Sequence, residues 1–269
     1  MITQTVVPFK LGITEEKITA HAGLVVFGEF VHATGILKEV DNALKGPGSG
    51  AGYRPSEYVE PIMLMLNGGG RTLEDLRVIR NDVGLCELLG IEDIPSSDAV
   101  GDWLRRKGKG DGLSGLEAVR GLVVRRALNL ETITEYTLDI DASQIVAEKA
   151  DAKMTYKGRF GYMPIVGHLA ENGIVVGEEF REGNESPGAR NLEFIRYCAS
   201  QLPEGRRIAH IRSDSAAYQA DIINWCEEMS VQFAMGADMD VSVKAAILAI
   251  PATQWSPYQN GHIAETVHT

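Results

Sequence analysis

The stretch Thr137–Ser143 constrains the fold more than any other, because apolar and polar residues alternate along it. Successive side chains of a β-strand point to opposite faces of the sheet. The apolar residues are therefore expected to face a core, while Asp139 and Asp141 share the opposite face. Two carboxylates this close repel each other unless a cation lies beside them, and a divalent metal ion is the usual cation. The alternative is an exposed edge strand whose acids are solvated.

A chain of 269 residues is long enough for two domains of ordinary size. Its composition, 44% apolar and 23% charged residues, is that of a globular protein. There is no N-terminal leader pattern and no long apolar run, so we expect a cytoplasmic protein. The three cysteines are far apart and form no Cys-x-x-Cys pair, which indicates neither a disulfide framework nor a zinc site.

Helical periodicity dominates the first part of the chain, which predicts a helical domain over residues 1–130. The expected helices cover Thr14–Leu37, Ser56–Leu66 and Leu73–Leu89, and the first is expected to end near Gly35. The glycine-rich stretch Gly46–Gly52 looks like a phosphate-binding loop, but no Gly-Lys-Ser/Thr follows it and no strand precedes it. It is therefore expected to be a flexible loop.

A DNA contact is predicted at the end of this domain. Asp98–Arg106 follows a short turn and a Ser cap, as the second helix of a helix-turn-helix would. The net charge of the chain is −11, yet from Gly101 to Leu130 seven basic residues stand against three acidic ones. The alternative is a solvated helix end, because basic residues also suit the helix dipole there. The four residues expected to contact DNA are Arg105, Arg106, Lys107 and Lys109.

From about residue 131 strands alternate with helices, which predicts an α/β domain over residues 131–269. Strands are expected over residues 137–143, 161–169, 173–180, 207–213 and 231–235. The first three would form an antiparallel meander, and helices would separate the others. This is the order of elements in an RNase H-like fold, a mixed β-sheet flanked by helices, whose first and fourth strands are neighbours.

Asp214 stands directly after the fourth expected strand. Neighbouring strands lie about 5 Å apart, so Asp141 on the first strand and Asp214 could hold the same ion. Paired carboxylates of this kind bind Mg²⁺, which activates a water or a 3′-hydroxyl for attack at phosphorus.

Several short motifs, taken in order, carry a family likeness. They are Gly68–Gly70 followed by Leu73-Glu-Asp-Leu76, then Leu138–Ser143, Lys157–Pro164 and Arg212–Ser215. With these motifs the chain resembles the DDE transposases of bacterial insertion sequences, in the branch whose RNase H-like domain contains a β-rich insertion. The resemblance implies Mg²⁺ as the cofactor, with Mn²⁺ as a substitute, and the double-stranded DNA of transposon ends as the partner. A homodimer, pairing through the extended segment after Trp255, would fit.

The resemblance also implies roles for individual residues. Asp141 and Asp214 correspond to the first and second catalytic carboxylates, which would hold the metal ion. Asp139 is either a further metal ligand or a structural acid. Arg212 either contacts a DNA phosphate or forms a structural ion pair with Asp139. The six histidines show no metal-ligand spacing.

The family needs a third carboxylate, a Glu on a helix after the β-insertion. This sequence is expected to be truncated where that insertion would begin, and we expect it to lack that acid. Three functions follow as hypotheses. The first is a transposase, or a fragment of one, that binds element ends and cleaves them when complete. The second is a catalytically inactive DNA-binding remnant that inhibits the full-length transposase, and the third is a stand-alone RNase H-like nuclease.

Overall fold

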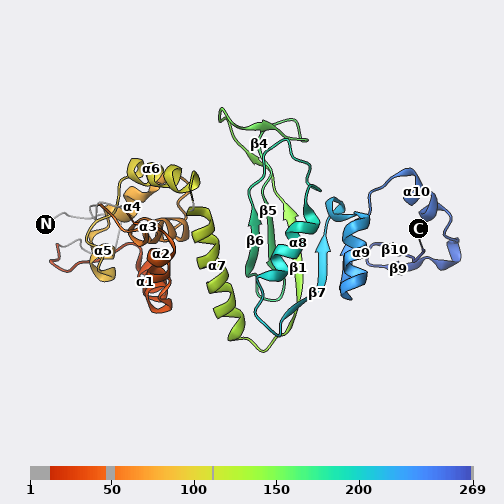
Figure 1. Ribbon diagram of the computed structural model, residues 1–269, viewed down its shortest axis with the longest axis horizontal. Helices are drawn as coiled ribbons and strands as arrows, with labels where there is room; N and C mark the ends of the chain where they lie inside the picture. Colours follow the sequence, from red (N-terminus) through yellow and green to blue (C-terminus); the bar gives the residue numbers. More distant parts are fainter. Residues whose placement is uncertain (1–12, 47–51, 111, 268–269) are drawn as a thin grey trace, which may run out of the picture. The chain divides into compact units, whose positions relative to one another are not determined.

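The structure, a computed structural model, describes residues 13–46, 52–110 and 112–267. It divides into two compact units, residues 1–123 and 124–269 (Figure 1). The boundary falls inside helix α7 (Gly112–Asn129), which lies where no helix was predicted. Most of the predicted loop Gly46–Gly52 lies outside the described residues. No described helix is both long and apolar enough to span a membrane.

The first unit is helical, as expected from its periodicity. Its helices are α1 (Ala22–Thr34), α2 (Ile36–Ala43), α3 (Pro55–Asn67), α4 (Leu76–Arg80), α5 (Val83–Leu89) and α6 (Ser97–Gly108), with a 3-10 turn η1 (Leu73–Asp75) before α4. Buried leucines from several helices form the core, and Trp103 stacks on Tyr58 with the ring centroids 4.8 Å apart. Both aromatic side chains are buried, so this stack anchors α6 to α3.

The predicted helix Thr14–Leu37 is wrong at its start, whereas its expected end near Gly35 is confirmed. Residues before Ala22 are not helical, because Thr19 donates to Asp82 at 2.6 Å and the Nδ1 atom of His21 lies 2.8 Å from the same carboxylate. These side-chain contacts compete with helical turns. At the other end Gly35 adopts a left-handed conformation, with φ of 69°, and α2 starts after it.

The predicted helix Leu73–Leu89 is also wrong as a single element. It is divided into η1, α4 and α5, and the last break lies at Asp82. The side chain of Asp82 accepts a hydrogen bond from the backbone N–H of Leu85 at 2.9 Å, so it caps α5. A capping Asp favours a new helix start over continuation of the helix before it.

The second unit is built on a five-stranded sheet with the order β6-β5-β1-β7-β8. The strands are β1 (Glu135–Ala142), β5 (Ile165–Leu169), β6 (Val175–Glu179), β7 (Arg207–Ser213) and β8 (Gln232–Met235). β1, β5 and β6 form an antiparallel meander, while β7 is parallel to β1 and β8 is parallel to β7 (Figure 1). Helices α8 (Asn191–Ser200), α9 (Ala220–Met229) and α10 (Val241–Leu248) follow β6, β7 and β8. The α/β class and the RNase H-like strand order are confirmed.

The alternation along β1 is also confirmed. Tyr136, Leu138 and Ile140 are buried in the core, and Asp139 and Asp141 lie on the other face. Helix α8 packs close to the sheet because Gly167 and Gly177, paired on β5 and β6, leave room for Cys198. A Cβ atom at Gly177 would lie 2.5 Å from the Cys198 sulfur.

A small second sheet with the order β2-β4-β3 joins β1 to β5. Its strands are β2 (Ile145–Val146), β3 (Lys153–Met154) and β4 (Phe160–Tyr162). The predicted strand over residues 161–169 is therefore wrong as one element, because β4 and β5 belong to different sheets and Pro164, which has no N–H to donate, lies between them. After α10, a 3-10 turn η3 (Ala252–Gln254) leads to a hairpin of β9 (Ser256–Tyr258) and β10 (Gly261–Ile263).

Candidate active site at the edge of the sheet

The parallel pairing of β1 and β7 determines where the two predicted acids lie. In this register Asp139 faces Arg212 and Ile140 faces Ser213. Asp141 and Asp214 each follow these paired residues directly, on strands that run in the same direction. Since neighbouring strands lie about 4.8 Å apart, the structure brings both acids to the same edge of the sheet.

Asp141 is exposed near the end of β1. The hydroxyl of Ser143 donates to its Oδ2 atom at 3.2 Å. Ser143 is itself held by its backbone N–H, which donates to the carbonyl of Pro164 at 2.9 Å. Ser143, the hydroxyl residue two positions after Asp141, thus helps to hold the Asp141 carboxylate in place.

Asp214 follows β7 and precedes the 3-10 turn η2 (Ser215–Ala217). Its Oδ1 atom accepts a hydrogen bond from the backbone N–H of Ala216 at 2.9 Å. A backbone N–H at the start of a helical turn stabilises a carboxylate and orients it. The second acid is therefore held by the turn that follows it.

Asp139 shares the exposed face but is engaged by Arg212. The Nε atom of Arg212 donates to Oδ1 at 2.7 Å and its Nη2 atom donates to Oδ2 at 2.5 Å. These hydrogen bonds lower the pKa of Asp139 and raise the pKa of Arg212. Of the two roles considered for Arg212, the structure shows the ion pair with Asp139.

Sequence reasoning missed His168. Its Nε2 atom lies 3.5 Å from Asp139 Oδ2, because His168 faces Asp139 in the register of β5 and β1. The signal that could have found it is the alternation along β5, where Ile165, Gly167 and Leu169 are buried and His168 falls between them.

The acid pair suits a hard divalent cation. Mg²⁺ takes oxygen ligands, keeps several waters and is commonly held by one or two carboxylates. Asp141 and Asp214 offer such oxygens at one edge, whereas both oxygens of Asp139 already accept from Arg212. Within the described residues no group of three His, Cys, Asp or Glu side chains is placed to hold an ion.

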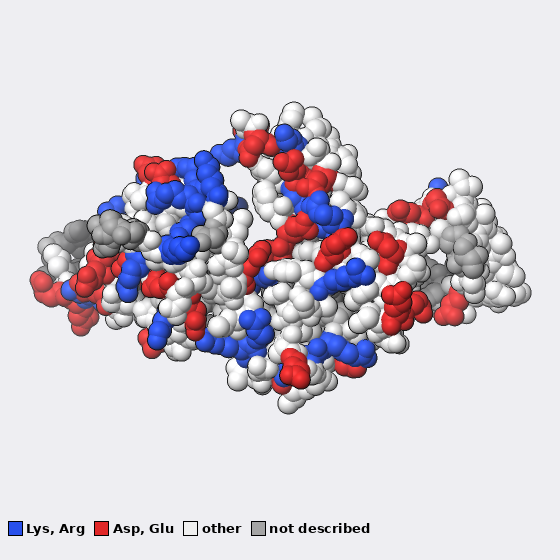
Figure 2. Space-filling view, viewed as in Figure 1, with Lys and Arg blue, Asp and Glu red and all other residues white. Residues whose placement is uncertain are grey.

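The four residues predicted to contact DNA lie at the C-terminal end of α6 and just beyond it. Arg105 pairs with Asp102 at 2.6 Å, and Lys107 donates to the carbonyl of Lys45 at 2.6 Å. Arg106 and Lys109 are exposed. Figure 2 shows Lys and Arg side chains gathered over this helix.

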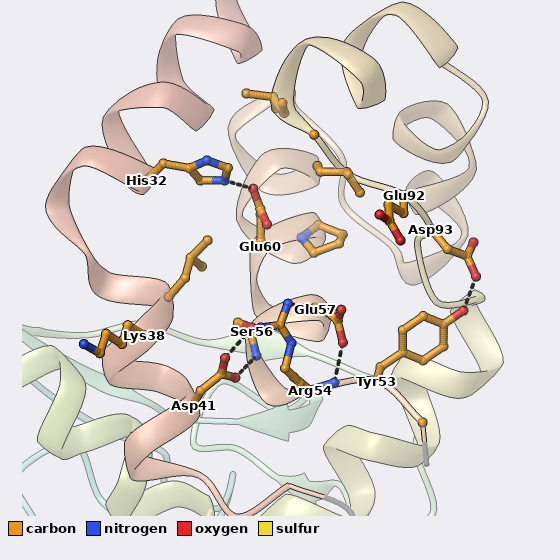
Figure 3. A pocket seen from close by; sticks show the side chains of 16 residues that line it. His32, Lys38, Asp41, Tyr53, Arg54, Ser56, Glu57, Glu60, Glu92 and Asp93 are labelled. Atoms are coloured by element: carbon orange, nitrogen blue, oxygen red, sulfur yellow. Dashed lines mark hydrogen bonds and ion pairs between the residues drawn. The ribbon is translucent and has the colours of Figure 1, made fainter. Parts of the chain in front are cut away.

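A separate pocket of about 850 Å³ lies among the helices of the first unit. Figure 3 shows His32 pointing to Glu60, and Asp41 beside Ser56. The Nε2 atom of His32 lies 2.5 Å from Glu60, and Ser56 donates to Asp41 at 2.8 Å from both its N–H and its hydroxyl. None of the predicted site residues lines this pocket.

The sheet order, with β1 and β7 as parallel neighbours, is that of an RNase H-like fold. The sequence model of the family described as "Transposase DDE domain group 1" matches residues 8–268. The chain therefore belongs to this family of DDE transposases.

Solved structures with distant similarity include those of an integrase and of a transposase. The HTLV-2 integrase catalytic core domain in complex with magnesium is 14% identical, with a TM-score of 0.29, and the match covers 39% of this chain and 61% of that one. The Mos1 mariner paired end complex with Mn is 15% identical, with a TM-score of 0.29 and coverage of 81% and 72%. The Mos1 Strand Transfer Complex is 14% identical, with a TM-score of 0.28 and coverage of 76% and 67%. No curated protein matches the chain.

Proposed function

We propose that this chain is a transposase, or part of one, that binds the end DNA of a bacterial insertion sequence and uses Mg²⁺ for strand cleavage and transfer. The observation that supports it most is the parallel register of β1 and β7, which sets Asp141 and Asp214 at one edge of the sheet. Membership of the DDE transposase family supports the same reaction class.

The proposed roles follow from the contacts. Asp141 and Asp214 hold the ion, and Ala216 orients Asp214 through its N–H. When bound, Mg²⁺ would activate the attacking oxygen and stabilise the leaving oxygen at phosphorus. Arg212 joins β1 and β7 next to the acids. Its side chain is 57% exposed and a guanidinium has five N–H groups, so it can also contact a DNA phosphate.

Basic residues at the end of α6 are the proposed DNA contacts of the first unit. Arg105, Arg106 and Lys109 are exposed, and Lys107 is half-buried. We include a homodimer in the proposal. The strands β9 and β10 are exposed and form a sheet of only two strands, so their edges are available to a second copy.

A second candidate is a DNA-binding chain that does not cleave and that inhibits the full-length transposase. It rests on the expectation that this chain lacks the third carboxylate that the family resemblance implies, which leaves Asp141 and Asp214 as the acids of the site. Two acids can bind Mg²⁺, but in-line phosphoryl transfer needs the attacking and leaving oxygens both clamped. This second candidate predicts that the chain binds DNA with little or no cleavage.

One assay separates the two candidates. The purified chain is mixed with its element's end DNA and Mg²⁺ or Mn²⁺, and both binding and strand nicking are measured. Nicking that is lost in Asp141→Asn and Asp214→Asn supports the transposase. The control is Glu135→Gln, at the opposite end of β1, which should leave nicking unchanged. Binding without nicking supports the second candidate, and no DNA binding at all contradicts both.

A further inference from the structure

The second unit buries an arginine that the proposed chemistry does not use. Arg181 follows β6 and is fully buried. A buried guanidinium is costly unless its N–H groups are paired. Its Nη2 atom donates to Glu179 at 2.9 Å, and its Nη1 atom donates to the side-chain oxygen of Asn191 at 3.0 Å. The centroid of the Phe194 ring lies 5.9 Å from the guanidinium carbon.

Glu179 balances the buried charge. It also accepts from Arg190, at 3.1 Å from Nε and 2.5 Å from Nη2. Burial raises the pKa of Glu179, but hydrogen bonds from Arg181 and Arg190 lower it by more, so the carboxylate stays ionised. Arg181 is therefore held in one orientation by an anion on one side and Asn191 on the other.

Asn191 connects Arg181 to the turn beside the candidate active site. It is the first residue of α8 and only 2% exposed. Its amide nitrogen donates to the carbonyl of Ala216 at 3.2 Å. That carbonyl also accepts from Gln219 at 2.8 Å, and the same Gln219 nitrogen donates to the carbonyl of Gly188 at 2.8 Å.

Ala216 is the residue whose N–H donates to Asp214 at 2.9 Å. A continuous series of hydrogen bonds thus runs from Arg181 through Asn191 and Ala216 to the second acid. The turn η2 has only three residues. A 3-10 turn of this length makes few hydrogen bonds of its own, and the side chains of Asn191 and Gln219 add to them at the Ala216 carbonyl.

We propose that Arg181 and Asn191 are positioning residues, which hold the η2 turn and so orient the Asp214 carboxylate for the divalent ion. This rests on the proposed function. A well-packed apolar pair of the same volume would often be as stable as a buried ion pair. The network can therefore serve to orient the turn, as residues behind metal ligands do.

The test uses Asn191→Asp in the full chain. This change keeps the size and the oxygen that accepts from Arg181, but it replaces the amide that donates to Ala216. Two quantities are measured: Mn²⁺ affinity by electron paramagnetic resonance, and amide hydrogen exchange of residues 213–219 in metal-free protein. We expect Mn²⁺ affinity to fall about tenfold and exchange at Ala216 to become faster.

Two further variants complete the design. Asn172→Asp is the matched control, since Asn172 donates to Glu131 at 3.0 Å in the turn between β5 and β6, and it should alter stability but not Mn²⁺ affinity. Gly188→Ala tests the same turn from its other side, because a Cβ there would lie 2.9 Å from the Gln219 nitrogen and 3.0 Å from the Ala216 carbonyl. It should also weaken Mn²⁺ binding, and it serves if Asn191→Asp does not fold.

The positioning role and the metal site of the proposed function can be contradicted separately. Unchanged Mn²⁺ affinity in Asn191→Asp and Gly188→Ala, when Asp214→Asn abolishes binding, would overturn the positioning role alone. Equal Mn²⁺ affinity in wild type and Asp214→Asn would contradict the metal site of the proposed function. In that case the metal-free exchange decides the inference, and unchanged exchange at Ala216 would overturn it.

Discussion

Arg212 and Asp139 form a two-point ion pair across β7 and β1, at positions that face each other in the register of the two strands. It lies next to the ends of both strands, where Asp141 and Asp214 stand. The pair joins the two strands next to the ends where the two acids lie. It also engages the one further carboxylate on this strand face that had been a candidate metal ligand.

The ion pair makes stability depend on pH. Arg212 lowers the folded-state pKa of Asp139 below the unfolded value of about 3.9. The stabilisation is therefore fully present above about pH 4 and is lost as the pH falls through the folded pKa. Asp139→Asn should lower the free energy of unfolding by about 1 kcal/mol at neutral pH, since Asp139 is only 20% exposed.

Urea unfolding between about pH 6 and pH 3 checks this expectation. The difference between wild type and Asp139→Asn should shrink at the acidic end. The matched control is Glu135→Gln, because Glu135 pairs with Arg207 at 2.8 Å across the same two strands but both side chains are more than half exposed. Its effect should be smaller. An equal effect of the two substitutions would contradict a special role for the Asp139 pair.

DNA binding should depend on the end of α6. Replacing Arg105, Arg106, Lys107 and Lys109 with Ala should weaken DNA binding and lower the slope of log affinity against log salt by about one for each lost phosphate contact. Fluorescence anisotropy over a salt series measures both quantities.

The control for that variant removes the same charge from the same unit. Lys17, Arg71, Arg77 and Arg80 are all exposed. Changing these four to Ala should leave the salt slope close to that of wild type. If both fourfold variants behave alike, binding reflects net charge and α6 has no special part in it.

The glycine pair under α8 should not tolerate a side chain. Gly177→Ala would bring a Cβ to 2.5 Å from the Cys198 sulfur, and overpacking of this kind costs about 1 to 3 kcal/mol. The double variant with Cys198→Ala removes the clash, so it should be less destabilised than the sum of the single changes. Simple additivity in urea unfolding would show that the helix shifts away instead.

The cysteines should differ in reactivity. Cys198 and Cys226 are fully buried, whereas Cys86 is partly accessible. A thiol reagent should therefore label one site in the native chain and all three only after unfolding, and Cys86→Ser should remove the native labelling. Burial raises the pKa of the Cys86 thiol, so its labelling rate should keep increasing above about pH 8.5. Rapid native labelling of Cys226 would contradict the packing of α9.

Local sequence patterns were enough to predict the central sheet. Alternation around Asp139 and Asp141 predicted which face of β1 is buried, and the order of strands and helices predicted that β1 and β7 are neighbours. The position of Asp214 directly after β7 could likewise be read from the sequence. These predictions hold because periodicity records which side of an element is buried, and burial of apolar surface is the main force in folding.

Other features of the fold depend on contacts between residues that are distant in the sequence. The late start of α1 depends on Asp82, which meets Thr19 and His21 only in the folded chain. Arg181 looks like a loop residue in the sequence, yet tertiary packing buries it and joins it through Asn191 to the turn beside Asp214. A hydrogen bond between side chains far apart in sequence leaves no periodic pattern, because it depends on where the fold brings the two residues.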